Sequence, residues 1–178
     1  MDQPSYTIRP ERPADHPAIR RLVAAAFDPE PVADLVDAIR ASEHYLPAMA
    51  FVAEIAGTVV GHTMISGATL RAADNEWPIV MLSPLAVAKT HRRQGIGGVL
   101  VRAVCAIVDQ RGEPLVVIEG DPAYYGRFGF EHSLLYGIEI ELPEWAPPEA
   151  AQVMRLASYD PALRGKVEYP PAFTALSQ

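Results

Sequence analysis

One stretch of this chain constrains its fold more than any other, because an apolar strand leads through a basic loop and glycines into an apolar helix. It reads Leu82-Ser-Pro-Leu-Ala-Val-Ala-Lys-Thr-His-Arg-Arg-Gln-Gly-Ile-Gly-Gly-Val-Leu100. The first N–H groups of a helix have no partner within the helix, and they carry the positive end of its dipole. Gly95, Gly97 and Gly98 lack a Cβ, so a phosphate can approach the backbone closely. Arg92 and Arg93 add positive charge, and the stretch therefore predicts an anion site at a helix start.

Other phosphate-binding motifs fit this stretch less well. A P-loop requires lysine and then serine or threonine after its last glycine, but valine follows Gly98. A dinucleotide fingerprint requires glycine directly after the strand, whereas six polar or basic residues separate Ala88 from Gly95, and Leu100 replaces the third glycine. Glu119 nevertheless ends the next expected strand, where a ribose-binding acid would lie. A dinucleotide site, and a glycine-rich helix start without a ligand, therefore stay open as alternatives.

The rest of the chain alternates between strand and helix patterns, which favours an α/β (α+β) sheet protein. Apolar residues make up 49% of the 178 residues and no linker divides the chain, so we expect a single domain over 1–178. Strands are expected at 5–9, 51–55, 58–65, 79–87, 114–118 and 151–156. Helices are expected after Asp15 as an acidic N-cap, from Pro31, and over 95–108 and 122–128.

Composition and charge exclude several classes of partner. The net charge of −7 argues against nucleic acid, since nucleic-acid-binding proteins usually carry a basic face. The single cysteine, Cys105, allows no disulfide within the chain, and the five histidines are scattered without metal-ligand spacing. No run approaches the ~20 apolar residues that span a bilayer, and the N-terminal residues lack a signal-peptide pattern. We therefore expect a cytoplasmic protein with no metal, nucleic-acid or membrane partner.

Two motifs carry a resemblance to a known family. Arg92-x-x-Gly95-x-Gly97 resembles the acetyl-CoA pyrophosphate motif of the GNAT superfamily of N-acetyltransferases, and it lies between a strand and a helix as in that family. Tyr125-Gly-Arg-Phe-Gly129-Phe130 resembles the family's Tyr-x-x-x-Gly-Phe segment. The run 120–130 is similar to the bacterial subgroup described as YhbS-like predicted N-acetyltransferases. The resemblance covers a core of about 5–135, and the strands and turns of 136–178 resemble the same subgroup.

The resemblance implies a mixed, mostly antiparallel central sheet flanked by helices, which splays at the strand containing Pro84. Because proline has no N–H, a break there would free the backbone of the next residues. In the family, the pantetheine arm of acetyl-CoA binds such a backbone as an added strand, here Leu85, Ala86 and Val87. The resemblance places the pyrophosphate on Arg92, Arg93, Gln94, Gly95, Ile96, Gly97 and Gly98. The helix residues expected in the core are Val99, Leu100, Ala103, Val104 and Ile107.

Candidate proton donors and acceptors complete the expected site. Tyr125 lies where many family members place a tyrosine beside the CoA sulfur, so it is the expected general acid, or else an aromatic that packs there. Tyr124 lies about 100° away round the helix and is expected to pack. Glu119 and His62 are the candidate general bases, with a salt-bridged strand end and a structural histidine as their alternatives. Cys105 is expected to be buried and inert.

The expected function is the direct transfer of an acetyl group from acetyl-CoA to an amine in a ternary complex, with no covalent acyl-enzyme. The acceptor amine belongs to a small molecule or a protein. A non-catalytic acyl-CoA-binding or sensing domain is the alternative, since this fold alone does not prove turnover. Both a monomer and a homodimer are compatible with the sequence.

Overall fold

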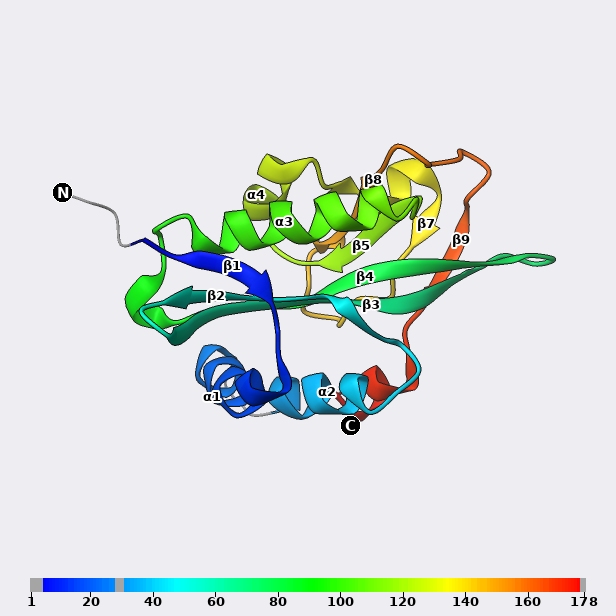
Figure 1. The fold of residues 1–178 in the computed structure, drawn as a ribbon. Helices are drawn as coiled ribbons and strands as arrows, with labels where there is room; N and C mark the ends of the chain where they lie inside the picture. The colour runs from blue at the N-terminus through cyan, green and yellow to red at the C-terminus, as the bar shows by residue number, and fades with distance from the viewer. Residues whose placement is uncertain (1–4, 28–30, 177–178) are drawn as a thin grey trace.

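The computed structural model describes residues 5–27 and 31–176, and its nine-stranded sheet lies between two layers of helices (Figure 1). The strands are β1 (Thr7–Pro10), β2 (Tyr45–Ile55), β3 (Thr58–Arg71), β4 (Glu76–Val87), β5 (Leu115–Glu119), β6 (Glu131–His132), β7 (Ile138–Glu139), β8 (Ala151–Arg155) and β9 (Gly165–Glu168). The α-helices are α1 (His16–Ala26), α2 (Pro31–Arg40), α3 (Ile96–Gln110) and α4 (Pro122–Tyr125). Of the short 3-10 helices, η3 (Gly126–Phe128) follows α4, and η6 (Pro171–Leu176) is the last described element. Residues 1–4, on which the expectation of no signal peptide was based, lie outside the described residues.

The sheet has the strand order β1-β2-β3-β4-β5-β8-β6, with β9 paired to β3 and β7 paired to β9. Neighbouring strands are antiparallel except for β4 with β5 and β7 with β9. Helix α3 connects the parallel pair β4 and β5, and together with α4 it covers one face of the sheet (Figure 1). Helices α1 and α2 and the C-terminal η6 cover the other face (Figure 1). The expected mixed, mostly antiparallel sheet flanked by helices is confirmed.

Each strand that the sequence predicts is present, although several bounds differ. Strand β2 begins at Tyr45 and β3 runs on to Arg71, so the central hairpin is longer than expected. The sequence missed β6, β7 and β9, which have two, two and four residues. Strands this short hold too few residues to show a period of two. They bring the C-terminal part of the chain into the sheet, because β9 pairs with the end of β3.

The sheet splays between β4 and β5, as the resemblance implied. These two strands pair only at Val80 with Val116 and at Met81 with Val117, so β5 leaves the second half of β4 unpaired. On its other edge β4 stays paired with β3 as far as Val87, apart from a bulge opposite Pro84. The sheet therefore contains an open backbone edge at its centre, directly before the glycine-rich loop.

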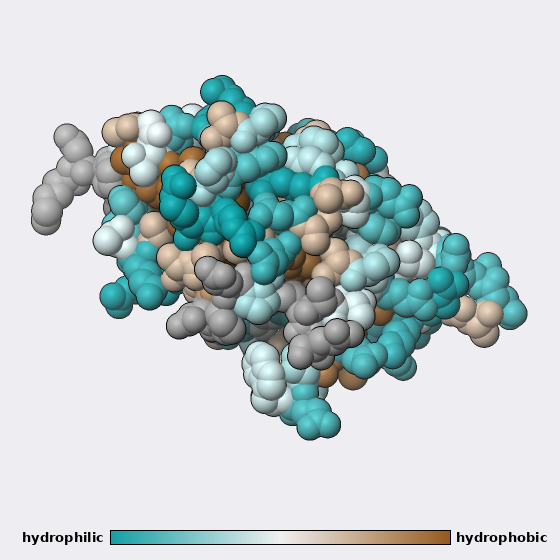
Figure 2. Space-filling view, turned by 90° about the horizontal axis from the view of Figure 1, so that it is seen from below, coloured by the Kyte–Doolittle hydropathy of each residue, from teal (hydrophilic) through white to brown (hydrophobic). Residues whose placement is uncertain are grey.

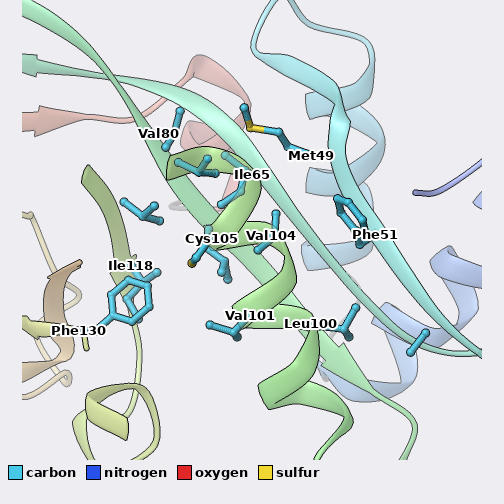
Figure 3. Packing of buried hydrophobic residues seen from close by; sticks show 14 of the residues in the cluster. Met49, Phe51, Ile65, Val80, Leu100, Val101, Val104, Cys105, Ile118 and Phe130 are labelled. Carbon is cyan, nitrogen blue, oxygen red and sulfur yellow. The ribbon is translucent and has the colours of Figure 1, made fainter. Parts of the chain in front are cut away.

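Helix α3 packs on the sheet through one apolar face (Figure 3). Leu100, Val104 and the neighbouring Cys105 are buried, as expected. Three other helix residues expected in the core are only half-buried: Val99, Ala103 and Ile107. They follow one another at intervals of four residues and so form a stripe at the margin of the buried face. The buried side chains of Ile96 and Leu100 lie against Gly61 of β3, where an added Cβ would come within 3.1 Å and 3.0 Å of them.

The opposite face of the sheet is covered by amphipathic helices. Helix α2 buries Leu35, Val36 and Ile39 against the sheet, while the described residues on the outer surface of this layer are mostly hydrophilic (Figure 2). Asp15 precedes α1, but the expected side-chain cap is wrong. Its carboxylate instead accepts hydrogen bonds from the Arg9 guanidinium at 2.7 Å and 2.9 Å, which ties the helix start to β1. No helix in the described ranges is both long and apolar enough to cross a membrane.

Candidate active site

The loop between β4 and α3 leaves several backbone N–H groups free. Gly95 adopts φ +82°, a left-handed conformation that favours glycine. The first hydrogen bond of the helix runs from the Val99 N–H to the Gly95 carbonyl. The N–H groups of Ile96, Gly97 and Gly98 therefore have no acceptor within the helix and lie at the positive end of its dipole. This is the geometry of an anion site.

A cavity of about 660 Å³ opens at this helix start. Its lining residues are Val87, His91, Arg92, Arg93, Gly95, Ile96, Gly97, Gly98, Arg102, Tyr124, Arg127 and Phe128. The lining thus includes the end of β4 and most of the predicted pyrophosphate loop. It contains four arginines and no carboxylate, although the whole chain carries a net charge of −7. The cavity is therefore a positively charged site on an acidic protein.

Four of the residues expected to bind the cofactor do not line this cavity. Leu85 is half-buried against the core beneath α3, whereas Ala86 is buried among the residues beneath α1 and α2. The Gln94 side chain donates a hydrogen bond to the Thr90 carbonyl at 3.3 Å, within the loop itself. The predicted roles of Leu85 and Ala86 involve their backbone, which stays on the unpaired edge of β4. Tyr125 is the fourth expected cofactor-binding residue that does not line the cavity.

Sequence reasoning missed Arg102, Arg127 and the position of Tyr124. Tyr124 was expected to pack, but it lines the cavity, and its hydroxyl oxygen lies 2.5 Å from the place of a Cβ on Gly97. A Cβ at position 97 would therefore displace the end of the Tyr124 side chain. Helical spacing could have indicated the two arginines. Arg102 follows Gly98 by four residues and Arg127 follows Tyr124 by three, and residues at these spacings are neighbours on one face of a helix.

Tyr125 lies behind Tyr124, on the sheet side of α4. Its ring contacts Phe130 edge-to-face, with ring centroids 5.7 Å apart. The ring also packs so closely on Gly120 that a Cβ there would overlap it. Burial, with smaller effects of Tyr124 and Cys105, raises the pKa of the Tyr125 phenol well above its usual value. The phenol therefore holds its proton at neutral pH.

Glu119 ends β5 and forms a long-range hydrogen bond. The hydroxyl of Tyr169 donates to Glu119 Oε1 at 2.8 Å, across 50 residues of sequence. Partial burial raises the pKa of the Glu119 carboxyl, and the hydrogen bond from Tyr169 acts in the opposite direction. Burial also raises the pKa of the Tyr169 phenol, and the charge of Glu119 raises it further. Tyr169 is thus the donor and Glu119 the acceptor at neutral pH.

His62 lies on β3 in a different cluster, centred on the buried carboxylate of Glu11. Arg40 and Tyr45 donate hydrogen bonds to Glu11 at 2.8 Å and 2.7 Å, and His62 Nε2 lies 2.9 Å from it. Burial lowers the pKa of His62, so the imidazole is neutral and donates its Nε2–H. Burial alone would raise the pKa of Glu11. The hydrogen bonds outweigh the effect of burial and hold the pKa of Glu11 well below its usual range. The cluster joins α2 to the sheet.

Comparison with known proteins shows the family to which this chain belongs. The family described as acetyltransferase (GNAT) domain matches residues 7–133. The chain is 34% identical over 158 residues to the uncharacterized N-acetyltransferase YhbS of Escherichia coli K12, which covers 89% of this chain and 90% of that protein. It is 31% identical over 126 residues to the uncharacterized N-acetyltransferase YjhQ of the same strain, covering 71% and 70% of the two chains.

Two solved structures share the fold over nearly the whole chain. The crystal structure of E. coli YhbS in complex with CoA has a TM-score of 0.85 at 32% identity and covers 95% of this chain and 92% of that chain. A GNAT family acetyltransferase from Brucella melitensis in complex with acetyl-CoA has a TM-score of 0.76 at 29% identity, covering 96% and 99%. From its sequence and its fold alike, this chain belongs to the GNAT acetyltransferase family.

Proposed function

We propose that this protein transfers the acetyl group of acetyl-CoA to an amine, and that the two bind together in a ternary complex. One observation carries the proposal: the arginine-lined cavity meets, at Val87, the half of β4 that β5 leaves unpaired. A ligand with a charged pyrophosphate and a long arm rich in amide groups fits this combination. The similar structures from E. coli and B. melitensis hold CoA and acetyl-CoA, which supports the same donor here.

In the proposed complex, each part of acetyl-CoA meets a different element. The pyrophosphate lies at the free N–H groups of Ile96, Gly97 and Gly98, with Arg92 and Arg93 beside it. The pantetheine arm follows the open edge of β4 from Val87 back to Leu85 and pairs with its backbone. The thioester then reaches the splay between β4 and β5. This placement orients the carbonyl for attack, and orientation of this kind is a large source of rate enhancement.

The proposed chemistry uses one proton acceptor and one donor. The protonated amine gives a proton to the Glu119 carboxylate, directly or through water, and its free lone pair attacks the thioester carbonyl carbon. A backbone N–H near Leu85 stabilises the resulting oxyanion. The C–S bond then breaks, the departing thiolate takes a proton from the Tyr125 phenol, and the phenolate is reprotonated by the second proton that the nitrogen loses as the amide forms, directly or through water. His62 is the second candidate base, and only its Nδ1 could accept a proton because Nε2 bonds to Glu11.

Calorimetric titration with acetyl-CoA, with NADH as the control ligand, tests the proposal. We expect micromolar binding of acetyl-CoA and none of NADH. No acetyl-CoA binding would remove the central claim, whereas NADH binding would restore the dinucleotide alternative with Glu119 as a ribose ligand. A screen of amines for free-thiol release then separates an enzyme from a non-catalytic acyl-CoA-binding domain. The proposed site is built from one chain, so a monomer or a homodimer can carry it, and we propose a cytoplasmic location, where acetyl-CoA is available.

The substitution Tyr125→Phe is expected to lower kcat about 100-fold, because it removes the proposed proton donor and keeps the ring that packs on Phe130. The Kd for acetyl-CoA should stay within about twofold of the wild-type value, since Tyr125 does not line the cavity. Initial rates of thiol release and calorimetry measure the two quantities. Tyr159→Phe, which removes a hydroxyl outside the cavity lining, serves as the control. An unchanged kcat would overturn the acid assignment.

The substitution Tyr169→Phe is expected to raise the pKa of Glu119. The Tyr169 hydroxyl stabilises the ionised carboxylate, so its loss favours the protonated form, and the pKa of Glu119 moves further above its usual value. Carbon-13 NMR titration of the Glu119 carboxyl measures this shift without an acceptor amine. If Glu119 is the base, the acidic limb of the kcat/KM profile moves to higher pH by the same amount.

A matched control is available for that titration. Tyr136 donates a hydrogen bond of 2.7 Å to Glu131 in an exposed pair elsewhere on the protein. Tyr136→Phe should leave the pKa of Glu119 and the pH profile unchanged. Equal pKa values for Glu119 in the wild type and in Tyr169→Phe would contradict the proposed stabilisation.

A further inference from the structure

We infer that Arg102 and Arg127 form a second phosphate site in the cavity, which binds the 3′-phosphate of CoA and selects CoA over 3′-dephospho-CoA. This inference rests on the proposed function. It concerns two residues outside the pyrophosphate loop, one on α3 and one on η3.

Both guanidinium groups are held in place by aromatic rings. The Arg102 Cζ lies 4.9 Å from the centre of the Phe128 ring. The Arg127 Cζ lies 4.6 Å from the centre of the Tyr124 ring, and its Nε donates to the Tyr124 carbonyl at 3.1 Å. Stacking on a ring fixes the plane of a guanidinium and leaves N–H groups at its edge free. Two arginines are thereby ordered at one place before any ligand binds.

Neither guanidinium is neutralised within the described ranges of the chain. Five other arginines form ion pairs with carboxylates there, namely Arg9, Arg20, Arg40, Arg71 and Arg155, whereas Arg111 and Arg164 form none there and lie outside the cavity. No such ion pair is found for Arg102 or Arg127, and no carboxylate lines the cavity. Both guanidinium groups lie within 5.4 Å of the centre of the Phe128 ring and line the same cavity, so an anion in this part of the cavity would offset the charge of both.

The charges of the ligand match two pairs of arginines. The pyrophosphate of CoA carries two negative charges, and a phosphomonoester such as the 3′-phosphate carries about −1.5 to −2 at neutral pH. The helix N-terminus with Arg92 and Arg93 already provides for the pyrophosphate. Arg102 and Arg127 remain for the 3′-phosphate, the other anionic group of CoA.

The position of this pair fits the nucleotide end of CoA. Arg102 and Phe128 also line a neighbouring hollow of about 240 Å³, formed largely by apolar side chains of α3 and the end of β8, with one carboxylate, Asp109, that accepts a hydrogen bond from the Ala157 N–H. Val87 and the open edge of β4, where the pantetheine arm is proposed to lie, do not line this hollow. Arg102 is therefore at the end of the cavity away from the thioester, where the adenosine and its 3′-phosphate leave the site.

Calorimetric titration of the intact protein with CoA and with 3′-dephospho-CoA tests the inference. We expect the wild type to bind CoA about tenfold to a hundredfold more tightly, the usual range for charge-assisted hydrogen bonds. In the double variant Arg102→Gln, Arg127→Gln this ratio of Kd values should fall to near one, with little change for 3′-dephospho-CoA. The phosphorus-31 resonance of the bound 3′-phosphate should also shift between wild type and variant.

Two control variants make the result specific. Arg92→Gln should weaken the binding of both nucleotides equally and leave the ratio unchanged. Arg111→Gln makes the same charge change just beyond the other end of α3, outside the cavity, and should leave both affinities unchanged. Equal weakening of both nucleotides in the double variant, or a wild-type ratio near one, would overturn the inference and keep the proposed function. Absence of CoA binding in the wild type would overturn the proposed function itself.

Discussion

Acetyl-CoA is expected to bind at least about 100-fold more weakly, by roughly 3 kcal/mol, when Gly97 is replaced by glutamate. Gly97 lies in the first turn of α3, and a Cβ there would come within 2.5 Å of the Tyr124 hydroxyl. The new carboxylate would enter a cavity lined by four arginines. It would form ion pairs with these arginines in place of the ligand and would repel the pyrophosphate. Calorimetric titration of the variant with acetyl-CoA measures the loss.

The substitution Gly97→Ala separates the charge of this change from its size. A methyl group must displace only the end of the Tyr124 side chain, so we expect a loss of about tenfold or less. The thermal unfolding midpoints of both variants, compared with the wild type, check that the fold is intact. Wild-type affinity in a folded Gly97→Glu protein would contradict the placement of the pyrophosphate at this helix start.

Replacing Glu119 by glutamine is expected to lower kcat about 1,000-fold, within the usual range for a general base. The amide oxygen can still accept the hydrogen bond from Tyr169, so the C-terminal segment keeps its contact. The Kd for acetyl-CoA should not change, because Glu119 does not line the cavity. Thiol release with an acceptor from the amine screen measures kcat, and calorimetry measures Kd.

The control for this variant is Glu131→Gln. Glu131 accepts a hydrogen bond from Tyr136, as Glu119 does from Tyr169, but it is exposed and not part of the proposed site. Its kcat should equal that of the wild type. If Glu119→Gln retained wild-type turnover, Glu119 would be a structural strand end, and His62→Gln would become the next variant to measure.

Local residue patterns predicted the part of the site that lies on one continuous segment. Glycines, arginines and an apolar helix follow one another between Pro84 and Leu100, and the structure has a strand, a loop and a helix there. The splay at β4, the strand containing Pro84, was also predicted from a family resemblance, although β5 leaves β4 after Met81 and the bulge at Pro84 faces β3. The loop conformation depends on backbone chemistry within a few residues, such as the left-handed φ of Gly95.

Contacts between distant segments were not predictable in the same way. Glu119 meets Tyr169, and His62 meets Glu11, across 50 and 51 residues. Which of two adjacent tyrosines, Tyr124 or Tyr125, lines the cavity depends on how α4 packs on Gly97 and Gly120. A short-range pattern indicates whether a segment forms a helix or a strand. It does not indicate which distant segments lie beside it, because strand order and the packing of the whole chain determine those contacts. The anion-binding helix start is thus a local property of this sequence, whereas the partners of its catalytic candidates exist only in the folded protein.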